Sequence, residues 1–73
     1  MELEELKSGT IVIHKNSGRE YQVLHLGKLK LKFSNFKRWV NSVTYTGPDK
    51  VTGLPENFTR SFNDFKQSFS IKK

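Results

Sequence analysis

An alternation of basic and apolar side chains runs through residues 28–33, whose sequence is Lys-Leu-Lys-Leu-Lys-Phe. Successive side chains of a β-strand point to opposite faces, so a period of two indicates a strand with two chemically different faces. We expect Leu29, Leu31 and Phe33 to face the interior of the protein. The three lysines should then stand in a row on the solvent side.

Four further runs are rich in β-branched and aromatic residues and are separated by turn residues, as in an antiparallel sheet. They cover residues 10–14, 20–26, 39–46 and 58–60. Gly27 is expected to bend the chain or to form a bulge before the lysine-bearing strand. Residues 46–55 contain both prolines and two glycines, which predicts a long hairpin loop.

A short helix is predicted after the last of these strands. Ser61 has the side chain of an N-cap, and Asp64 follows three residues later, which is the spacing of a capping box. Phe62, Phe65 and Phe69 recur at helical spacing and define one apolar face. We expect this face to pack on the sheet.

Together these elements predict an all-β protein, namely a small barrel of about five antiparallel strands with a short C-terminal helix. Residues 1–8 are expected to form an N-terminal arm or helical turn, and residues 9–73 a single barrel domain. Phe33, Tyr45 and Phe65 should share one interior. An open antiparallel sheet packed on the helix is the alternative fold.

The composition describes a small domain that depends on packing. The chain has 73 residues, no cysteine and a net charge of +6, so neither a disulfide nor a thiolate zinc site supports the core. No apolar run reaches the roughly 20 residues of a membrane span, and the first residues are acidic where a secretory signal would be basic. We expect a cytoplasmic protein without a membrane partner. Its positive charge favours a polyanion such as nucleic acid.

The sequence contains no pattern typical of catalysis or metal binding. His14 and His25 have no further ligands at the spacing of a zinc site. The phosphate-binding patterns GxGxxG and GxxxxGK do not occur. The carboxylates after the first six residues are scattered, and turns, strand ends or caps explain them. We therefore expect no enzyme activity, no cofactor and no metal.

Basic side chains are the main candidates for a binding site. The candidate basic face consists of Lys28, Lys30, Lys32, Lys37 and Arg38. Alternate lysines on a strand lie about 7 Å apart, close to the spacing of neighbouring phosphates along a nucleic-acid strand. Prevention of edge-to-edge aggregation is the alternative explanation for lysines on an outer strand face.

Three more residues are candidates for ligand binding: two aromatic residues near the basic face and one arginine elsewhere in the chain. Phe36 and Trp39 would stack on bases, as aromatic side chains do in single-strand binders, although both also suit the core. Arg60 lies directly before the helix cap. Its guanidinium would either clamp an anion or hold the loop through a carboxylate such as Asp49.

Several short motifs resemble a small domain of unknown function that is common in bacteria and their phages. The matching motifs are Gly9-Thr10-x-x-x-His14-Lys15, Tyr21-x-Val23-Leu24, Trp39-x-x-x-Val43-x-Tyr45 and Phe58-x-Arg60 followed by Phe65. The resemblance covers residues 9–69 and aligns Arg60 with an arginine of that family. It implies an SH3-like barrel and a phage or prophage origin, and it implies no known activity. Small phage proteins of this kind often bind a host protein, including defence or transcription components.

We therefore expect a non-enzymatic binding module, for which two kinds of partner remain open. The first is a host protein, which would be bound and modulated through a face of the barrel or through the loop at residues 46–55. The second is single-stranded or non-specific nucleic acid, which would bind the lysine-rich strand face.

Overall fold

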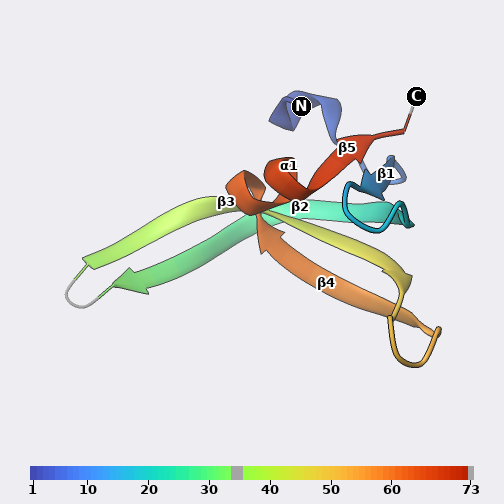
Figure 1. Ribbon diagram of the computed structural model, residues 1–73. Helices are drawn as coiled ribbons and strands as arrows, with labels where there is room; N and C mark the ends of the chain where they lie inside the picture. Colours follow the sequence, from blue (N-terminus) through green and yellow to red (C-terminus); the bar gives the residue numbers. More distant parts are fainter. Residues whose placement is uncertain (34–35, 73) are drawn as a thin grey trace.

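The computed structural model describes residues 1–33 and 36–72, and the side chains of residues 31–33 and 36 also lie outside the described set. These residues form a 3-10 helix η1 (Leu3–Glu5), five strands and one α-helix (Figure 1). The strands and the helix are β1 (Ile11–His14), β2 (Glu20–Phe33), β3 (Phe36–Pro48), β4 (Pro55–Ser61), α1 (Phe62–Ser68) and β5 (Phe69–Ile71).

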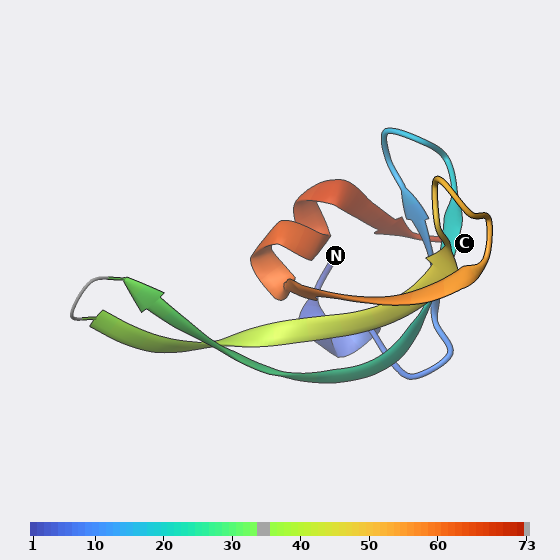
Figure 2. The same cartoon turned by 90° about the horizontal axis from the view of Figure 1, so that it is seen from below.

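All five strands belong to one antiparallel sheet with the order β4-β3-β2-β1-β5. The short β1 pairs with β2 on one side and with β5 on the other, so that Val12 lies opposite both Tyr21 and Ile71. Figure 2 shows the sheet curving, with α1 on its concave side. The predicted class, mainly β with about five antiparallel strands and one short helix near the C-terminus, is confirmed.

The last strand was not expected. The run at residues 58–60 belongs to the fourth strand, and β5 follows α1 where the helix was expected to continue. Phe69 begins β5 and pairs with His14 of β1. The helix is therefore an insertion between two strands of the sheet, and its C-terminal end is fixed by the pairing of β5 with β1.

The interior is built mainly from aromatic and β-branched side chains. The buried apolar residues of the described part are Leu6, Val12, Val23, Val43, Tyr45, Phe65 and Phe69. The rings of Phe65 and Phe69 stack with centroids 4.5 Å apart, and the Tyr45 ring lies 5.4 Å from the first and 5.0 Å from the second. The expected shared interior of Tyr45 and Phe65 is thus present. Leu6 shows that the N-terminal turn contributes to it.

The start of α1 agrees with the predicted cap. The Ser61 side chain accepts a hydrogen bond from the backbone N–H of Asp64 at 3.3 Å, which satisfies one of the free N–H groups of the first turn. Phe65 is fully buried, and Phe62 is half-buried at the side of the same cluster. The cap therefore fixes the rotation of the helix that turns Phe65 toward the sheet.

Strands β2 and β3 form a long hairpin that contains a β-bulge. Val23 lies opposite Tyr45, but His25 lies opposite Thr44, so Leu24 is an extra residue in β2. Gly27 pairs regularly with Ser42. The expected bend at Gly27 is therefore wrong, and the two strands predicted on either side of it form one continuous strand.

The bulge changes which residues share a face of the hairpin. Directly opposed residues of an antiparallel pair lie on the same face. Val43 and Tyr45 of β3 point into the core, and their face continues through positions 41, 39 and 37 of β3. The opposed positions in β2 are 28, 30 and 32. The lysine positions, and not the leucine positions, therefore share the core-side face of the sheet.

For Leu29, this register overturns the expectation that the side chain faces the interior. Leu29 is half-buried on the opposite face of the sheet. The side chains of Leu31 and Phe33 lie outside the described residues. The backbone of Phe33 lies ten residues beyond Val23, at the far end of the hairpin that Figure 1 shows projecting from the domain.

The connection between β3 and β4 is shorter than predicted. Pro48 and Pro55 are opposed at the ends of the two strands, so the loop comprises residues 49–54. The Asp49 carboxylate accepts hydrogen bonds from the backbone N–H groups of Val51 at 2.7 Å and Thr52 at 3.1 Å. This side chain thereby replaces backbone partners that a regular hairpin would supply.

The described residues contain no helix that is long and apolar enough to cross a membrane.

Replacement of Phe65 by Ala should lower the free energy of unfolding by about 3 to 5 kcal/mol, because it empties a fully buried ring site between Phe69 and Tyr45. Urea denaturation followed by circular dichroism measures the loss. The control is Gln67→Ala, an exposed position of the same helix, which should change stability by less than about 0.5 kcal/mol. Equal effects of the two variants would contradict a buried helix face.

Candidate functional site

The part of the β2–β3 hairpin beyond the bulge forms a projecting arm, which we define as residues 27–33 and 36–42. Figure 1 shows this arm extending away from β1, β5 and α1. The sequence contains no Asp or Glu between Tyr21 and Pro48, whereas all five residues of the candidate basic face lie there. The arm therefore carries positive charge without an acidic residue of its own to compensate it.

Basic side chains from both strands lie on one face of the arm. Lys28 lies opposite Asn41, Lys30 opposite Trp39, and position 32 opposite Lys37. The side chains of Lys28, Lys30 and Lys37 are exposed. The side chain of Lys32 lies outside the described residues. This face of the arm, defined by positions 28, 30, 32, 37, 39 and 41, is called the basic face below.

Trp39 lies on the basic face and is 63% exposed. The interpretation that it belongs to the core is therefore wrong. The Lys30 Nζ lies 5.7 Å from the centroid of the indole ring, in the geometry of a cation–π contact. Phe36, the other candidate for stacking, has a side chain outside the described residues.

Arg38 lies opposite Leu31, and so its position is on the other face of the arm. It nevertheless contributes to one hollow of about 190 Å³ together with Lys28 and Trp39, where the arm meets the start of α1. Phe62 and Asn63 of α1 complete the wall of this hollow. Three residues predicted to bind nucleic acid are thus brought together beside the helix.

Arg60 is not part of the basic face, because its side chain contacts Tyr45, Ser68 and Phe69. Its Nε donates a hydrogen bond to the Tyr45 hydroxyl at 2.9 Å, and its Nη1 donates to the Ser68 hydroxyl at 3.4 Å. The guanidinium carbon lies 5.8 Å from the centroid of the Phe69 ring. Arg60 and Asp49 form no ion pair, so the loop is not held in the way that the sequence suggested.

The Tyr45 hydroxyl is held in its protonated form by burial. Desolvation raises the pKa of Tyr45 above its ordinary value, while the hydrogen bond and the positive charge of Arg60 act in the opposite direction. The neutral hydroxyl is the acceptor that orients the Arg60 guanidinium. The core and the guanidinium are therefore linked through a single phenol.

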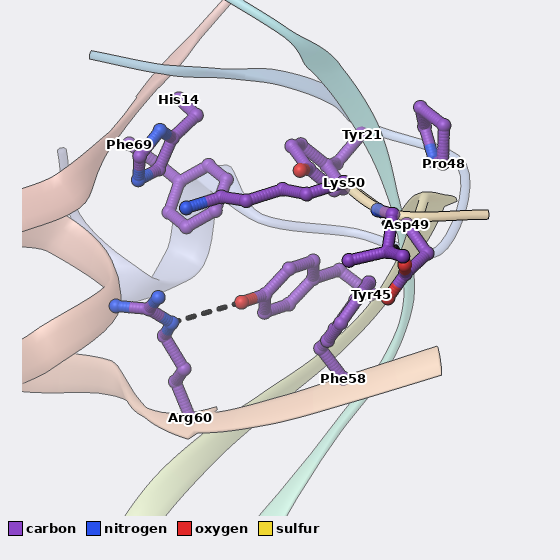
Figure 3. A pocket seen from close by; sticks show the side chains of 10 residues that line it. His14, Tyr21, Tyr45, Pro48, Asp49, Lys50, Phe58, Arg60 and Phe69 are labelled. Atoms are coloured by element: carbon purple, nitrogen blue, oxygen red, sulfur yellow. Dashed lines mark hydrogen bonds between the residues drawn. The ribbon is translucent and has the colours of Figure 1, made fainter. Parts of the chain in front are cut away.

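A second concave site, which we call the aromatic pocket, lies between β1, the β3–β4 loop, β4 and the start of β5, and has a volume of about 300 Å³ (Figure 3). Its aromatic walls are Tyr21, Tyr45, Phe58 and Phe69, and its polar lining residues are His14, Asp49, Lys50 and Arg60. Tyr21 reaches this place because Gly47 has no side chain, since a Cβ atom at Gly47 would collide with the Tyr21 ring.

The aromatic pocket was not predicted from the sequence, because every aromatic residue was expected to lie in the core or beside the basic residues. Tyr45 and Phe69 are indeed buried, but Tyr21 and Phe58 are only half-buried and face the pocket. The available signal was the position of Arg60, two residues after Phe58 on the same strand. Alternation places residues 58 and 60 on one face of a strand.

Asp49 and His14 have defined partners at the edge of the aromatic pocket. The two backbone hydrogen bonds from Val51 and Thr52 lower the pKa of the Asp49 carboxyl, with a smaller contribution from the charge of Arg19. His14 Nδ1 lies 3.0 Å from the Ser17 hydroxyl, and its ring packs edge-on against Phe69. Both residues therefore stabilise the turns that frame the pocket.

Comparison of the chain with family models, with curated proteins and with solved structures found no match in any of the three. The two sites are therefore interpreted from their own residues.

Replacement of Arg60 by Met should raise the pKa of Tyr45 further, because it removes both the hydrogen bond and the positive charge that favour the phenolate. Because the pKa of Tyr45 is higher in the folded state than in the unfolded state, the neutral phenol contributes to the free energy of unfolding. This contribution is fully present below pH 10 and is lost as the pH rises through the folded-state pKa. Phenolate absorbance during an alkaline titration measures the shift, and Tyr45→Phe assigns the signal. A lower Tyr45 pKa in Arg60→Met would contradict the observed contact.

Proposed function

We propose that this protein binds single-stranded nucleic acid through the basic face of the arm. The observation that carries the proposal is the exposed Trp39, which lies among lysines on a projecting hairpin without acidic residues. Proteins that bind single strands without sequence preference combine a positively charged track for the phosphates with aromatic side chains on which bases stack. The basic face offers both features on adjacent strands.

The spacing of the charges supports a strand-like ligand. Lys28 and Lys30 are alternate residues of β2 and are therefore separated by about 7 Å along the strand. Lys37 extends the same face on β3. A row of exposed ammonium groups neutralises successive phosphates and releases their counterions, which is the main source of affinity in non-specific binding.

The surroundings of Trp39 support base stacking beside that row. Lys30 packs over the indole, so the ring has a defined position next to a cation. The large exposed fraction of Trp39 leaves ring surface for a base, and stacking on an aromatic side chain contributes about 1 to 3 kcal/mol per base. Arg38 and Lys28 line the adjacent hollow beside α1, where they would hold the flanking phosphates.

A host protein, as for a phage-encoded modulator, is the second candidate partner. It is favoured by the tip of the β3–β4 loop, where Val51 is 91% exposed and Leu54 65% exposed. Two exposed apolar side chains on one loop provide much less contact area than a stable protein interface buries. The uncompensated charge of the arm therefore makes nucleic acid the better supported ligand.

The salt dependence of oligonucleotide binding tests the proposal. If the five basic residues of the arm each contact one phosphate, the plot of log affinity against log salt should have a slope of about −3.5 for a single strand. The triple variant Lys28→Gln, Lys30→Gln, Lys37→Gln should reduce the magnitude of this slope by about 2. Fluorescence anisotropy of a labelled oligonucleotide measures both values, and quenching of the single tryptophan reports stacking on Trp39.

The matched control is the triple variant Lys7→Gln, Lys15→Gln, Lys66→Gln, which removes the same charge from exposed residues outside the arm. It should keep most of the wild-type slope, and both variants should keep the wild-type melting temperature within a few degrees. Equal losses in the two variants would mean that only net charge matters. Absence of oligonucleotide binding by the wild-type protein would leave the host protein as the remaining partner.

A further inference from the structure

The aromatic pocket contains a guanidinium without an anionic partner. Arg60 is half-buried, and none of the carboxylates of residues 1–33 and 36–72 lies within ion-pair distance of it. Its two hydrogen bonds go to the neutral hydroxyls of Tyr45 and Ser68. A guanidinium has five N–H donors in a planar fork that matches phosphate and carboxylate groups. The contacts to Tyr45 and Ser68 orient this fork and leave part of it free.

The part of the guanidinium without a hydrogen bond is accessible. The described residues contain no buried side-chain nitrogen or oxygen that lacks a hydrogen-bond partner. The Nη2 of Arg60 has no hydrogen bond to a described residue, so it must be accessible, and Arg60 lines the aromatic pocket. An anion in the pocket would therefore meet donors that are already held in place.

Lys50 adds a second positive charge to the same pocket. Figure 3 shows its side chain extending from the β3–β4 loop across the pocket toward Phe69. One oxygen of the nearby Asp49 carboxylate, Oδ1, accepts hydrogen bonds from two backbone N–H groups of its own loop. The pocket thus presents two cations and one carboxylate that is already hydrogen-bonded, and this balance is complementary to an anion.

The rest of the lining suits a flat ring. The half-buried rings of Tyr21 and Phe58 lie 6.1 Å apart at an interplanar angle of 82°, so they form two walls at right angles. Tyr45 and Phe69 form the floor. An aromatic ligand would stack on one wall and meet the other edge-on, which are the preferred arrangements of aromatic pairs. A volume of about 300 Å³ is at the lower end of the range for small-molecule sites.

We propose that the aromatic pocket binds a nucleoside monophosphate, with the phosphate on Arg60 and Lys50 and the base against Tyr21 and Phe58. This site is separate from the basic face, because the two share no residue. A free nucleotide and the phosphorylated end of a strand present the same chemistry to it. The phosphorylated end of a strand differs from the free nucleotide only in that the rest of the strand must extend out of the pocket.

Titration of the ¹⁵N-labelled protein with adenosine 5′-monophosphate tests the proposal. Backbone amide shifts should change in the β3–β4 loop and around Phe58, and not along the arm. Inorganic phosphate alone and adenosine alone should each bind at least about tenfold more weakly, because each makes only half of the contacts. A 5′-phosphorylated oligonucleotide that shifts the same amides, where its unphosphorylated form does not, would identify the end of a strand as the source.

Variants separate this site from the arm. Lys50→Gln should weaken binding of the monophosphate by about tenfold, because it removes one charge-assisted contact. Lys7→Gln, an exposed charge outside the pocket, should leave the affinity unchanged. The arm triple variant should also bind the monophosphate as tightly as the wild type. Arg60→Lys keeps the charge but loses the fork, and it should weaken binding while preserving the fold.

Three results would overturn the proposal. The first is absence of shifts in the loop at millimolar monophosphate. The second is equal binding of inorganic phosphate and the monophosphate, which would show that the aromatic walls contribute nothing. The third is an equal effect of Lys50→Gln and Lys7→Gln. Failure of the arm to bind oligonucleotides would not affect any of these measurements.

Discussion

Leu24 has no residue opposite it in β3, and this one extra residue determines which side chains of the hairpin face the core. Val23 contacts the core from the position opposite Tyr45. Beyond the bulge the same face passes through Lys28 and Lys30. A hairpin without the bulge would place positions 29 and 31 on the core side, and positions 28 and 30 on the other side. The bulge therefore allows a strand that begins in the core to end as a charged arm.

Tyr45 links the core of the sheet to the aromatic pocket. Its ring packs on Phe65 and Phe69 in the interior, and its hydroxyl accepts a hydrogen bond from Arg60 at the aromatic pocket. Burial keeps the phenol protonated, as the direction of its pKa shift indicates. The same residue thus contributes to stability through its ring and to the geometry of the pocket through its oxygen.

Local patterns in the sequence predicted the fold class, the cap at Ser61 and the burial of Phe65, because these depend on neighbouring residues. Other features depend on contacts distant in sequence. The three residues of β5 are a strand only because they pair with β1. Leu24 looks like any other apolar strand residue, so the bulge left no local signal, and the face of the lysines was assigned wrongly. Alternation correctly placed Trp39 on the same face as Val43 and Tyr45. It could not show that the hairpin extends beyond the packed core, so that Trp39 is exposed.

The register of β2 against β3 determines whether the lysines and Trp39 share one face, and it can be measured directly. Nuclear Overhauser effects between backbone protons of opposed strands identify which residues face each other. Cross-strand contacts should pair Val23 with Tyr45 and His25 with Thr44, leave Leu24 unpaired, and place Lys30 opposite Trp39. A regular register, with Leu24 opposite Thr44 and Lys30 opposite Arg38, would contradict this pairing and would place the lysines on the face away from Trp39.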